Sequence, residues 1–193
     1  LEVVNLCIEH KDVVGFDLAG PEVGFSVLNH KEACALAVEN NINVTLHADW
    51  EVPEGIKEVV LDSKAKRVGH GSQIINDVSF ENGAISFDND AAKYVFDNRV
   101  ALEICPTSNV QCGAYSSVSE HSFGELYNAG FNVTINTDNR LMSDITMSEE
   151  VSNVVESFGL GEKDILNITK NTIDAGFVES KLRTELLEKL SKY

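Results

Sequence analysis

The chain has few cationic residues and no long hydrophobic run. Lysine and arginine together number 15 against 31 aspartates and glutamates, so the formal net charge of the 193 residues is −16. A surface this acidic repels phosphate groups, which argues against nucleic acid and anionic membranes as partners and is compatible with a neutral or cationic small molecule. No apolar stretch reaches about 18 residues, the length that suggests a membrane span.

Motifs of common redox and nucleotide-binding sites are also missing. None of the four cysteines belongs to a Cys-x-x-Cys pair, so we expect buried, reduced thiols in a cytoplasmic protein. No Gly-x-Gly-x-x-Gly follows a predicted strand and no Gly-x-x-x-x-Gly-Lys occurs, which removes support for a nucleotide cradle. Linkers, repeats and low-complexity segments are absent as well, and we expect a single domain over residues 1–193.

Five apolar, β-prone segments each end in a polar or glycine-containing cluster. They cover residues 13–20, 43–49, 67–71, 101–109 and 132–139. Helical patterns lie between them, and this alternation predicts parallel βαβ units with right-handed crossovers. Because the active sites of (β/α) barrels form at the carboxyl ends of the strands, the polar clusters are the candidate site.

Helices are expected at the N-terminus, at residues 26–40, from Pro53 to residue 60, at 91–96 and 119–129, and in three segments after the last strand. Thr146 and Glu149 have the spacing of a capping box ahead of the first of these three. Gly130 is placed to end the helix before it, and Asn82-Gly83 signals a turn.

Two histidines and an aspartate stand at strand ends. His47 can bind zinc or another divalent metal, or it can be a partly buried histidine with a backbone hydrogen bond. His70 lies between two glycines that allow a ligand to approach, and it can act as a general base near neutral pH or simply occupy a turn. Asp138 can ligate a metal and orient its water, or it can cap the next helix.

A catalytic zinc ion usually has three protein ligands and a water molecule. The chain contains no His-x-His pair, so either further ligands come from another segment or there is no metal. Asn139, beside Asp138, can hydrogen-bond a substrate. The remaining histidines are expected to be structural; they are His10, His30 and His121.

Four strand-end motifs together resemble the adenosine deaminase family of the amidohydrolase superfamily. They are Asp17-Leu18-Ala19-Gly20-Pro21-Glu22, Arg67-Val68-Gly69-His70-Gly71, Glu103-Ile104-Cys105-Pro106-Thr107-Ser108-Asn109 and Asn136-Thr137-Asp138-Asn139. The resemblance implies a TIM (β/α)₈ barrel of which this chain holds about the last five β/α units. The first three strands, with the His-x-His pair of the family, would then be missing. A length of 193 residues, against about 250 for a complete barrel, and a start at Leu1 agree with this expectation.

The resemblance also implies a reaction, which is the zinc-dependent hydrolytic deamination of adenosine and deoxyadenosine in purine salvage. Water activated by Zn²⁺ attacks C6 of the purine, and ammonia leaves to give inosine. By this resemblance, His47 and Asp138 are the third and fourth protein ligands of the zinc ion. His70 handles the water proton and steadies the oxyanion-like adduct, while the backbone N–H of Gly20 meets a purine ring nitrogen. The Pro-Cys-x-x-Cys signature of cytidine-type deaminases is absent.

Two positions depart from the family pattern. The family motif His-Ala-Gly-Glu carries a glutamate that protonates purine N1, whereas this chain reads His47-Ala48-Asp49-Trp50-Glu51. A gapless match puts Trp50 at the acid position, which would disable the site, and a shift of one residue puts Glu51 there. We take Glu51 as the expected catalytic acid. Asn139 replaces a second aspartate of many members, and its amide can still donate to purine N7.

Other interpretations stay open on the sequence alone. The chain can be a catalytically disabled, purine-binding relic, or a related deaminase of adenine or AMP. AMP is disfavoured because no basic cluster for a phosphate lies near the strand ends, although Arg140 is one candidate. Five parallel strands without the rest of a barrel leave two open edges. We therefore expect the isolated chain to be poorly soluble or inactive and to need the missing N-terminal half.

Overall fold

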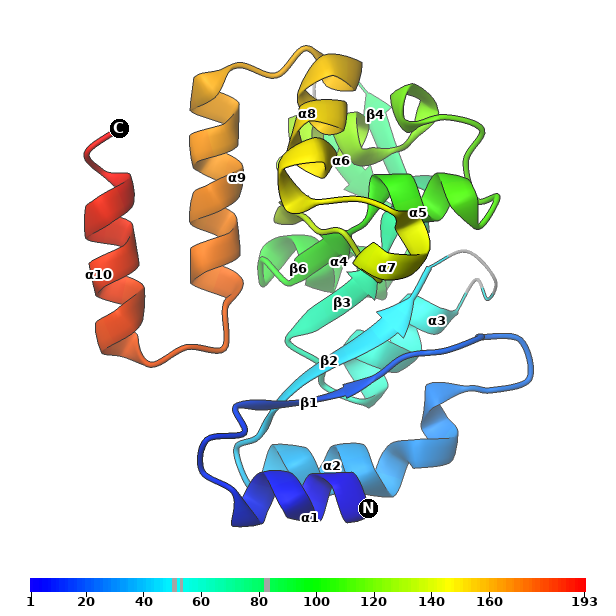
Figure 1. Cartoon of the computed structure of the whole chain (residues 1–193). Helices are drawn as coiled ribbons and strands as arrows, with labels where there is room; N and C mark the ends of the chain where they lie inside the picture. Colours follow the sequence, from blue (N-terminus) through cyan, green and yellow to red (C-terminus); the bar gives the residue numbers. More distant parts are fainter. Residues whose placement is uncertain (50–51, 53, 82–83) are drawn as a thin grey trace.

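A five-stranded parallel sheet forms the centre of the computed structural model, which describes residues 1–49, 52, 54–81 and 84–193. The strand order is β1-β2-β3-β6-β7, and Figure 1 shows β1, β2 and β3 lying next to one another. The five strands fall in the five predicted segments: β1 (Gly15–Leu18), β2 (Asn43–Ala48), β3 (Arg67–His70), β6 (Ala101–Ile104) and β7 (Val133–Ile135). The prediction of parallel β/α units is confirmed.

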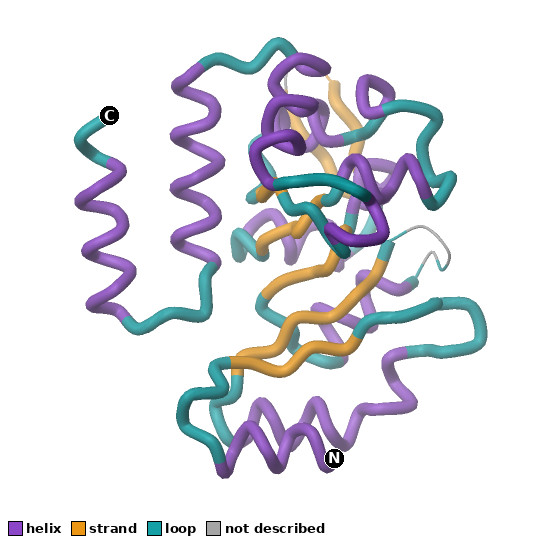
Figure 2. The backbone as a smooth tube through the Cα atoms, viewed as in Figure 1, coloured by secondary structure: helices purple, strands orange, loops and turns teal. Residues whose placement is uncertain are grey.

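Helices fill the connections between the strands (Figure 2). The α-helices before the last strand are α1 (Glu2–Glu9), α2 (Lys31–Glu39), α3 (Gly55–Lys57), α4 (Asp90–Asp97), α5 (Pro106–Gln111) and α6 (Phe123–Ala129). Those after it are α7 (Arg140–Ser143), α8 (Met147–Phe158), α9 (Glu162–Ala175) and α10 (Ser180–Leu190). Short 3₁₀ segments are η1 (Val27–His30), η3 (Ser72–Asp77) and η4 (Val118–Glu120), and α3 continues into the π-helical turn η2 (Glu58–Asp62). Within the described ranges, no helix is both long and apolar enough to cross a bilayer.

Helix ends follow the local signals of the sequence. The capping box of α8 is confirmed, since Glu149 N–H donates to Thr146 Oγ1 and the Glu149 carboxylate accepts from Thr146 N–H. Asn89 caps α4 by accepting a hydrogen bond from Ala92 N–H at 2.9 Å. Gly130 ends α6 in the left-handed conformation, with φ of 92°.

Two elements differ from expectation. An antiparallel hairpin of β4 (Val78–Glu81) and β5 (Ala84–Phe87) lies between β3 and α4, where no strands were predicted. The short helix α5 begins at Pro106, inside a segment taken as a strand end. Some residues with a sequence-based prediction lie outside the described residues; these are Trp50, Glu51, Pro53 and both residues of the turn Asn82-Gly83.

The two faces of the sheet have different chemistry. One row of side chains is fully buried and apolar, and includes Leu46, Val68 and Leu102. The alternate row is polar: Thr45 donates to the Glu103 carboxylate at 2.6 Å, and Arg67 Nε lies 2.9 Å from the other oxygen of that carboxylate. A parallel sheet covered by helices on both faces has apolar residues on both. The helices therefore pack against one face, and a polar, cross-linked face remains.

The strands of the described residues form an open sheet. The strands β1 and β7 each have one neighbour, on opposite sides of the sheet. The helix α9 packs against β7, and α10 lies beside α9 (Figure 1). The chain thus has the five predicted β/α units, and a closed eight-stranded barrel is not formed by the residues that the structure describes.

Replacing Gly71 by alanine is expected to destabilise the chain more than the same change at Gly113. Both glycines have positive φ, 68° and 83° respectively, which costs an alanine roughly 1–2 kcal/mol. A Cβ at position 71 would also lie 2.8 Å from the Cδ2 atom of buried Leu102, whereas a Cβ at position 113 would meet nothing within 4 Å. Urea unfolding of the two variants measures the difference, which we expect to be about 1–3 kcal/mol. Equal losses of stability in the two variants would show that the Leu102 side chain moves aside without a cost in free energy.

Candidate active site

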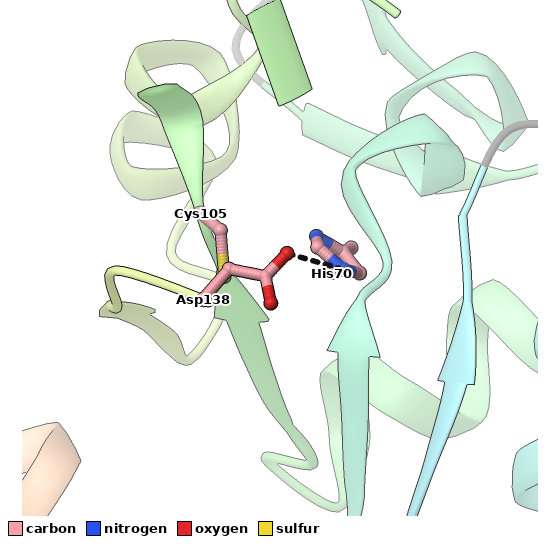
Figure 3. Close-up of side chains that lie close together, drawn as sticks. All are labelled: His70, Cys105 and Asp138. Carbon is pink, nitrogen blue, oxygen red and sulfur yellow. Dashed lines mark ion pairs between the residues drawn. The ribbon is translucent and has the colours of Figure 1, made fainter. Parts of the chain in front are cut away.

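Three polar side chains named by the sequence gather at the carboxyl ends of the strands. His47 is the second-to-last residue of β2, His70 ends β3, and Asp138 follows β7. The rings of His47 and His70 meet edge-on with their centroids 4.9 Å apart. His70 Nε2 lies 3.9 Å from Asp138 Oδ2, the pair joined by the dashed line in Figure 3. The structure thus brings the two histidines and the aspartate to one edge of the sheet.

The backbone is strained at two of these residues. His70 has a φ of 62° and Asp138 a φ of 54°, in the left-handed region that non-glycine residues rarely adopt. By strand alternation His70 would share the side of Val68, which is buried. The change in φ at the end of β3 instead accompanies a ring that faces His47 and Asp138. Strain of this kind is typical of functional positions.

Glu22 is the direct partner of His47. Its Oε1 atom lies 3.1 Å from His47 Nε2 and accepts a second hydrogen bond from Asp49 N–H at 2.9 Å. The hydrogen bond to the Glu22 carboxylate raises the pKa of His47, with smaller contributions from the carboxylates of Asp49 and Asp138. The interaction with the Glu22 side chain therefore favours a protonated His47, and its Nε2 is directed at that carboxylate.

Asp138 is held by two donors. Its Oδ2 accepts from Ser108 Oγ at 2.7 Å and its Oδ1 accepts from Asn139 N–H at 2.7 Å. The alternative that Asp138 caps the next helix is wrong, because Asn139 is the N-cap of α7 and its Oδ1 accepts from Met142 N–H. The carboxamide oxygen of Asn139 is the capping atom, and its side-chain N–H groups are the donors that a ligand would use.

The donor set suits a zinc ion in its chemistry. Ligand atoms of His70, Cys105 and Asp138 all lie within 4.8 Å of one another (Figure 3). Imidazole nitrogen, carboxylate oxygen and thiolate sulfur are all zinc ligands. Burial, and then the carboxylate of Asp138, raise the pKa of the Cys105 thiol far above its ordinary value, so this thiol is protonated in the metal-free protein. Imidazole and carboxylate groups are the donors that could bind a metal without first losing a thiol proton.

His47 stands outside that three-residue cluster. To serve as a metal ligand, its Nε2 would exchange the Glu22 carboxylate for the metal. Both His47 and Asp138 are at the same edge of the sheet, and the Asp138 carboxylate acts on the pKa of His47. Their pairing on a metal stays a prediction.

A buried polar network lies behind His70. Its members are at most 5% exposed and are joined by a continuous set of hydrogen bonds; they are Asp49, Ser72, Asn109 and His121. Sequence reasoning placed Asn109 in a matched motif without a role and treated His121 as structural. No local signal could have linked His121 to this site, because the network joins segments that are far apart in the chain.

A cavity of about 520 Å³ opens beside His47, between the end of β1 and α3. Gly20 and Glu22 line it together with Phe25 and Val59. A Cβ atom added at Gly20 would have no other atom within 4 Å, so the backbone at this position is open to a ligand. This volume is in the range of small-molecule sites.

A larger cavity, of about 760 Å³, lies at the opposite ends of the strands. It is lined by residues that precede β2, β6 and β7, among them Asn41 and Asn132. The imidazole and carboxylate groups described above are at the other edge, so chemistry, and not size, identifies the candidate site.

Polar and imidazole groups at the carboxyl ends of parallel β/α units stand where α/β proteins with parallel sheets carry their active sites. The chain belongs to the adenosine deaminase family: the family model described as "Adenosine deaminase" matches residues 1–193. The predicted family is thereby confirmed.

Individual relatives agree with this assignment. The chain is 40% identical over 196 residues to an adenosine deaminase of Mycobacterium marinum, covering 99% of this chain and 54% of that protein. An adenine deaminase structure from Arthrobacter aurescens superposes with a TM-score of 0.86 at 22% identity, over 100% of this chain and 56% of that one. The N6-methyl-AMP deaminase structure of Arabidopsis thaliana superposes with a TM-score of 0.82 at 28% identity, over 99% and 53%. The chain spans about half the length of the curated relatives it matches.

Proposed function

We propose that this chain supplies the C-terminal part of a zinc-dependent adenosine deaminase that hydrolyses adenosine and deoxyadenosine to inosine or deoxyinosine and ammonia, in purine salvage. The family match over residues 1–193 carries the proposal. The meeting of His47, His70 and Asp138 at one edge of the sheet supports it. The rest of the barrel, with the remaining zinc ligands, would come from a segment matching the N-terminal half of the relatives.

His47 and Asp138 are the residues of this chain that we propose as zinc ligands. A zinc ion held there would supply a water molecule of lowered pKa near neutral pH. Ser108 Oγ and Asn139 N–H fix the Asp138 carboxylate through hydrogen bonds of 2.7 Å each, which holds the oxygen atoms in place.

His70 is proposed to act on the water proton or on the adduct. Its ring contacts the ring of His47, and its Nε2 lies 3.9 Å from Asp138 Oδ2, so an oxygen atom added at purine C6 and held by the proposed ligands would lie beside it. A proton-bearing nitrogen at this place would stabilise negative charge developing on that oxygen. A bare nitrogen would instead accept a proton from the water.

The purine would be held by groups at the ends of β1 and β7. Gly20 lines the cavity beside His47, and its N–H is proposed to donate to a purine ring nitrogen. The amide of Asn139 is proposed to donate to N7. Glu51 is proposed as the acid that protonates N1, and it lies outside the described residues.

The test is complementation of the barrel. The 193-residue chain is expected to be inactive on adenosine with zinc, and co-expression with the N-terminal half of the Mycobacterium marinum relative is expected to restore turnover, followed as the loss of adenosine absorbance. Measurable turnover by the isolated chain would contradict the need for the other half. The assembled protein should also be tested as Trp50→Glu. If neither assembled form binds zinc or turns over adenosine, the chain is a purine-binding relic.

A related specificity is the second candidate, because an N6-methyl-AMP deaminase is among the structural neighbours. A nucleotide needs a cation for its phosphate, and Arg140 is exposed next to Asn139 at the strand-end edge. A panel of adenosine, adenine and AMP given to the assembled protein decides between them. We expect adenosine to have the highest kcat/KM, and preference for AMP that is lost in Arg140→Ala would favour the nucleotide.

A further inference from the structure

A line of hydrogen-bonding groups leads from a backbone amide to the ring of His70. It runs from Phe123 N–H through His121 and Asn109 to His70. Each group in this line has donors and acceptors whose positions constrain the next group. The protonation pattern of His70 can therefore be worked out from the backbone outward.

The first step fixes the tautomer of His121. Phe123 N–H donates to His121 Nδ1 at 2.9 Å, and a backbone amide can only donate, so Nδ1 carries no proton. The ring is only 3% exposed, and burial lowers the pKa of His121 to about 4. It is neutral at pH 7, and its proton is on Nε2.

The second step fixes the orientation of the Asn109 carboxamide. His121 Nε2 lies 3.2 Å from Asn109 Oδ1, so the N–H of His121 donates to that oxygen. Turning the carboxamide by 180° would place its NH₂ group against this donor. The other side agrees, because Asn109 Nδ2 donates to Asp49 Oδ2 at 2.9 Å.

The Asp49 carboxylate is itself held in place. Its Oδ1 accepts from Ser72 N–H at 2.8 Å and from Ser72 Oγ at 2.6 Å. The ring of His121 is fixed by stacking on Tyr115, with 4.0 Å between centroids, and the Tyr115 hydroxyl lies 3.0 Å from Ser72 Oγ. Two independent anchors therefore hold the carboxamide, one at each end.

The last step reaches His70. Asn109 Nδ2 has two protons; one is donated to Asp49, and His70 Nδ1 lies 3.3 Å from the same nitrogen. Two protons and two acceptors match, so His70 Nδ1 is an acceptor. The proton of the neutral His70 ring is then on Nε2, the nitrogen that lies 3.9 Å from Asp138 Oδ2.

We propose that Asn109 and His121 are positioning residues that hold His70 in the tautomer with its proton on Nε2, facing Asp138 and the strand-end site. Resting on the proposed function, this tautomer decides between the two roles of His70. The ring presents a donor that stabilises negative charge on the oxygen added at C6, and it does not accept the water proton at Nε2.

Nitrogen-15 NMR of the histidine rings tests the proposal without zinc, substrate or activity. The chain has five histidines, so single His→Gln variants assign the signals of the metal-free protein. Protonated and bare ring nitrogens have well-separated shifts. We expect His70 and His121 both to show a protonated Nε2 and a bare Nδ1. A neutral His70 ring with its proton on Nδ1 and a bare Nε2 would overturn the proposal, whether or not the assembled protein deaminates adenosine.

Asn109→Asp changes the group that faces His70 Nδ1 from a hydrogen-bond donor to an acceptor. A carboxylate has no N–H to donate, so it would draw a proton to His70 Nδ1, and the bare Nδ1 signal should be lost. Asn76→Asp is the matched control, since Asn76 is exposed and its side-chain amide donates to Gln73 Oε1, away from His70. His121→Phe keeps an aromatic ring against Tyr115 but removes the donor to Asn109, and should give a mixture of His70 tautomers. An unchanged His70 in folded Asn109→Asp and His121→Phe proteins would overturn the positioning role.

Discussion

Asp138→Asn is expected to abolish zinc binding by the assembled protein, and adenosine turnover with it. The substitution removes the negative charge of a proposed ligand while nearly keeping its shape. Loss of a group that merely supports a ligand weakens metal binding about 10–100-fold, so loss of the ligand charge should exceed 100-fold or so. Asparagine tolerates the positive φ of 54° at this position, so the fold should be retained. Competition with a chromophoric chelator measures the zinc affinity.

Asp144→Asn is the matched control for this prediction. Asp144 is exposed six residues further along and also has a positive φ, of 47°, at the end of α7. The two variants therefore share the change in charge and the backbone conformation, and differ in whether the carboxylate faces His70. Similar zinc affinities for the two variants would show that Asp138 is not a ligand.

Glu150→Leu is expected to lower the free energy of unfolding by about 3 kcal/mol. Glu150 is completely buried, on α8, and its carboxylate accepts hydrogen bonds from Thr107 N–H, at 2.9 Å, and from Thr107 Oγ1. Leucine would fill the space but leave the two partly buried donors of Thr107 without an acceptor, and removing one partner of such an interaction costs about 1–3 kcal/mol per group. Urea unfolding measures the change.

Two further variants make the test of Glu150 specific. Glu156→Leu, an exposed site on the same helix, should change stability by less than about 0.5 kcal/mol. Glu150→Gln keeps one acceptor oxygen and should fall between Leu and the original residue. Because Thr107 is in the first turn of α5, loss of the Glu150 contact should also loosen Ser108 and Asn109, the next two residues of that helix. If Glu150→Leu and Glu156→Leu had equal effects, the Thr107 contact would contribute nothing.

The strands could be predicted because each is a short apolar run with a clear polar end. The segment from Asn43 to Ala48 shows the pattern well, with Val44 and Leu46 buried and His47 partly exposed. The hairpin of β4 and β5 was missed although Asn-Gly is a strong hairpin signal, because its flanking strands are short and carry few β-branched residues. The start of α5 had a signal too, since Pro106 suits the first turn of a helix.

The site could be predicted only in outline. Strand ends meet at one edge of a parallel sheet, so the gathering of His47, His70 and Asp138 follows from topology. Which groups hydrogen-bond to them does not follow. Glu22 reaches His47 across 25 residues and His121 reaches His70 through Asn109, and both contacts depend on how loops close in space. Local patterns in a sequence carry no record of such closures.

The left-handed backbone at His70 limits what its mutagenesis can reveal. Valine or isoleucine would add a steric penalty at a φ of 62° to the loss of the imidazole, because branching at Cβ makes this conformation especially unfavourable. Loss of activity in such a variant could come either from misfolding or from the missing imidazole, and the measurement would not distinguish the two. Asparagine accepts this geometry far more readily, so His70→Asn is the substitution that reports on the ring alone.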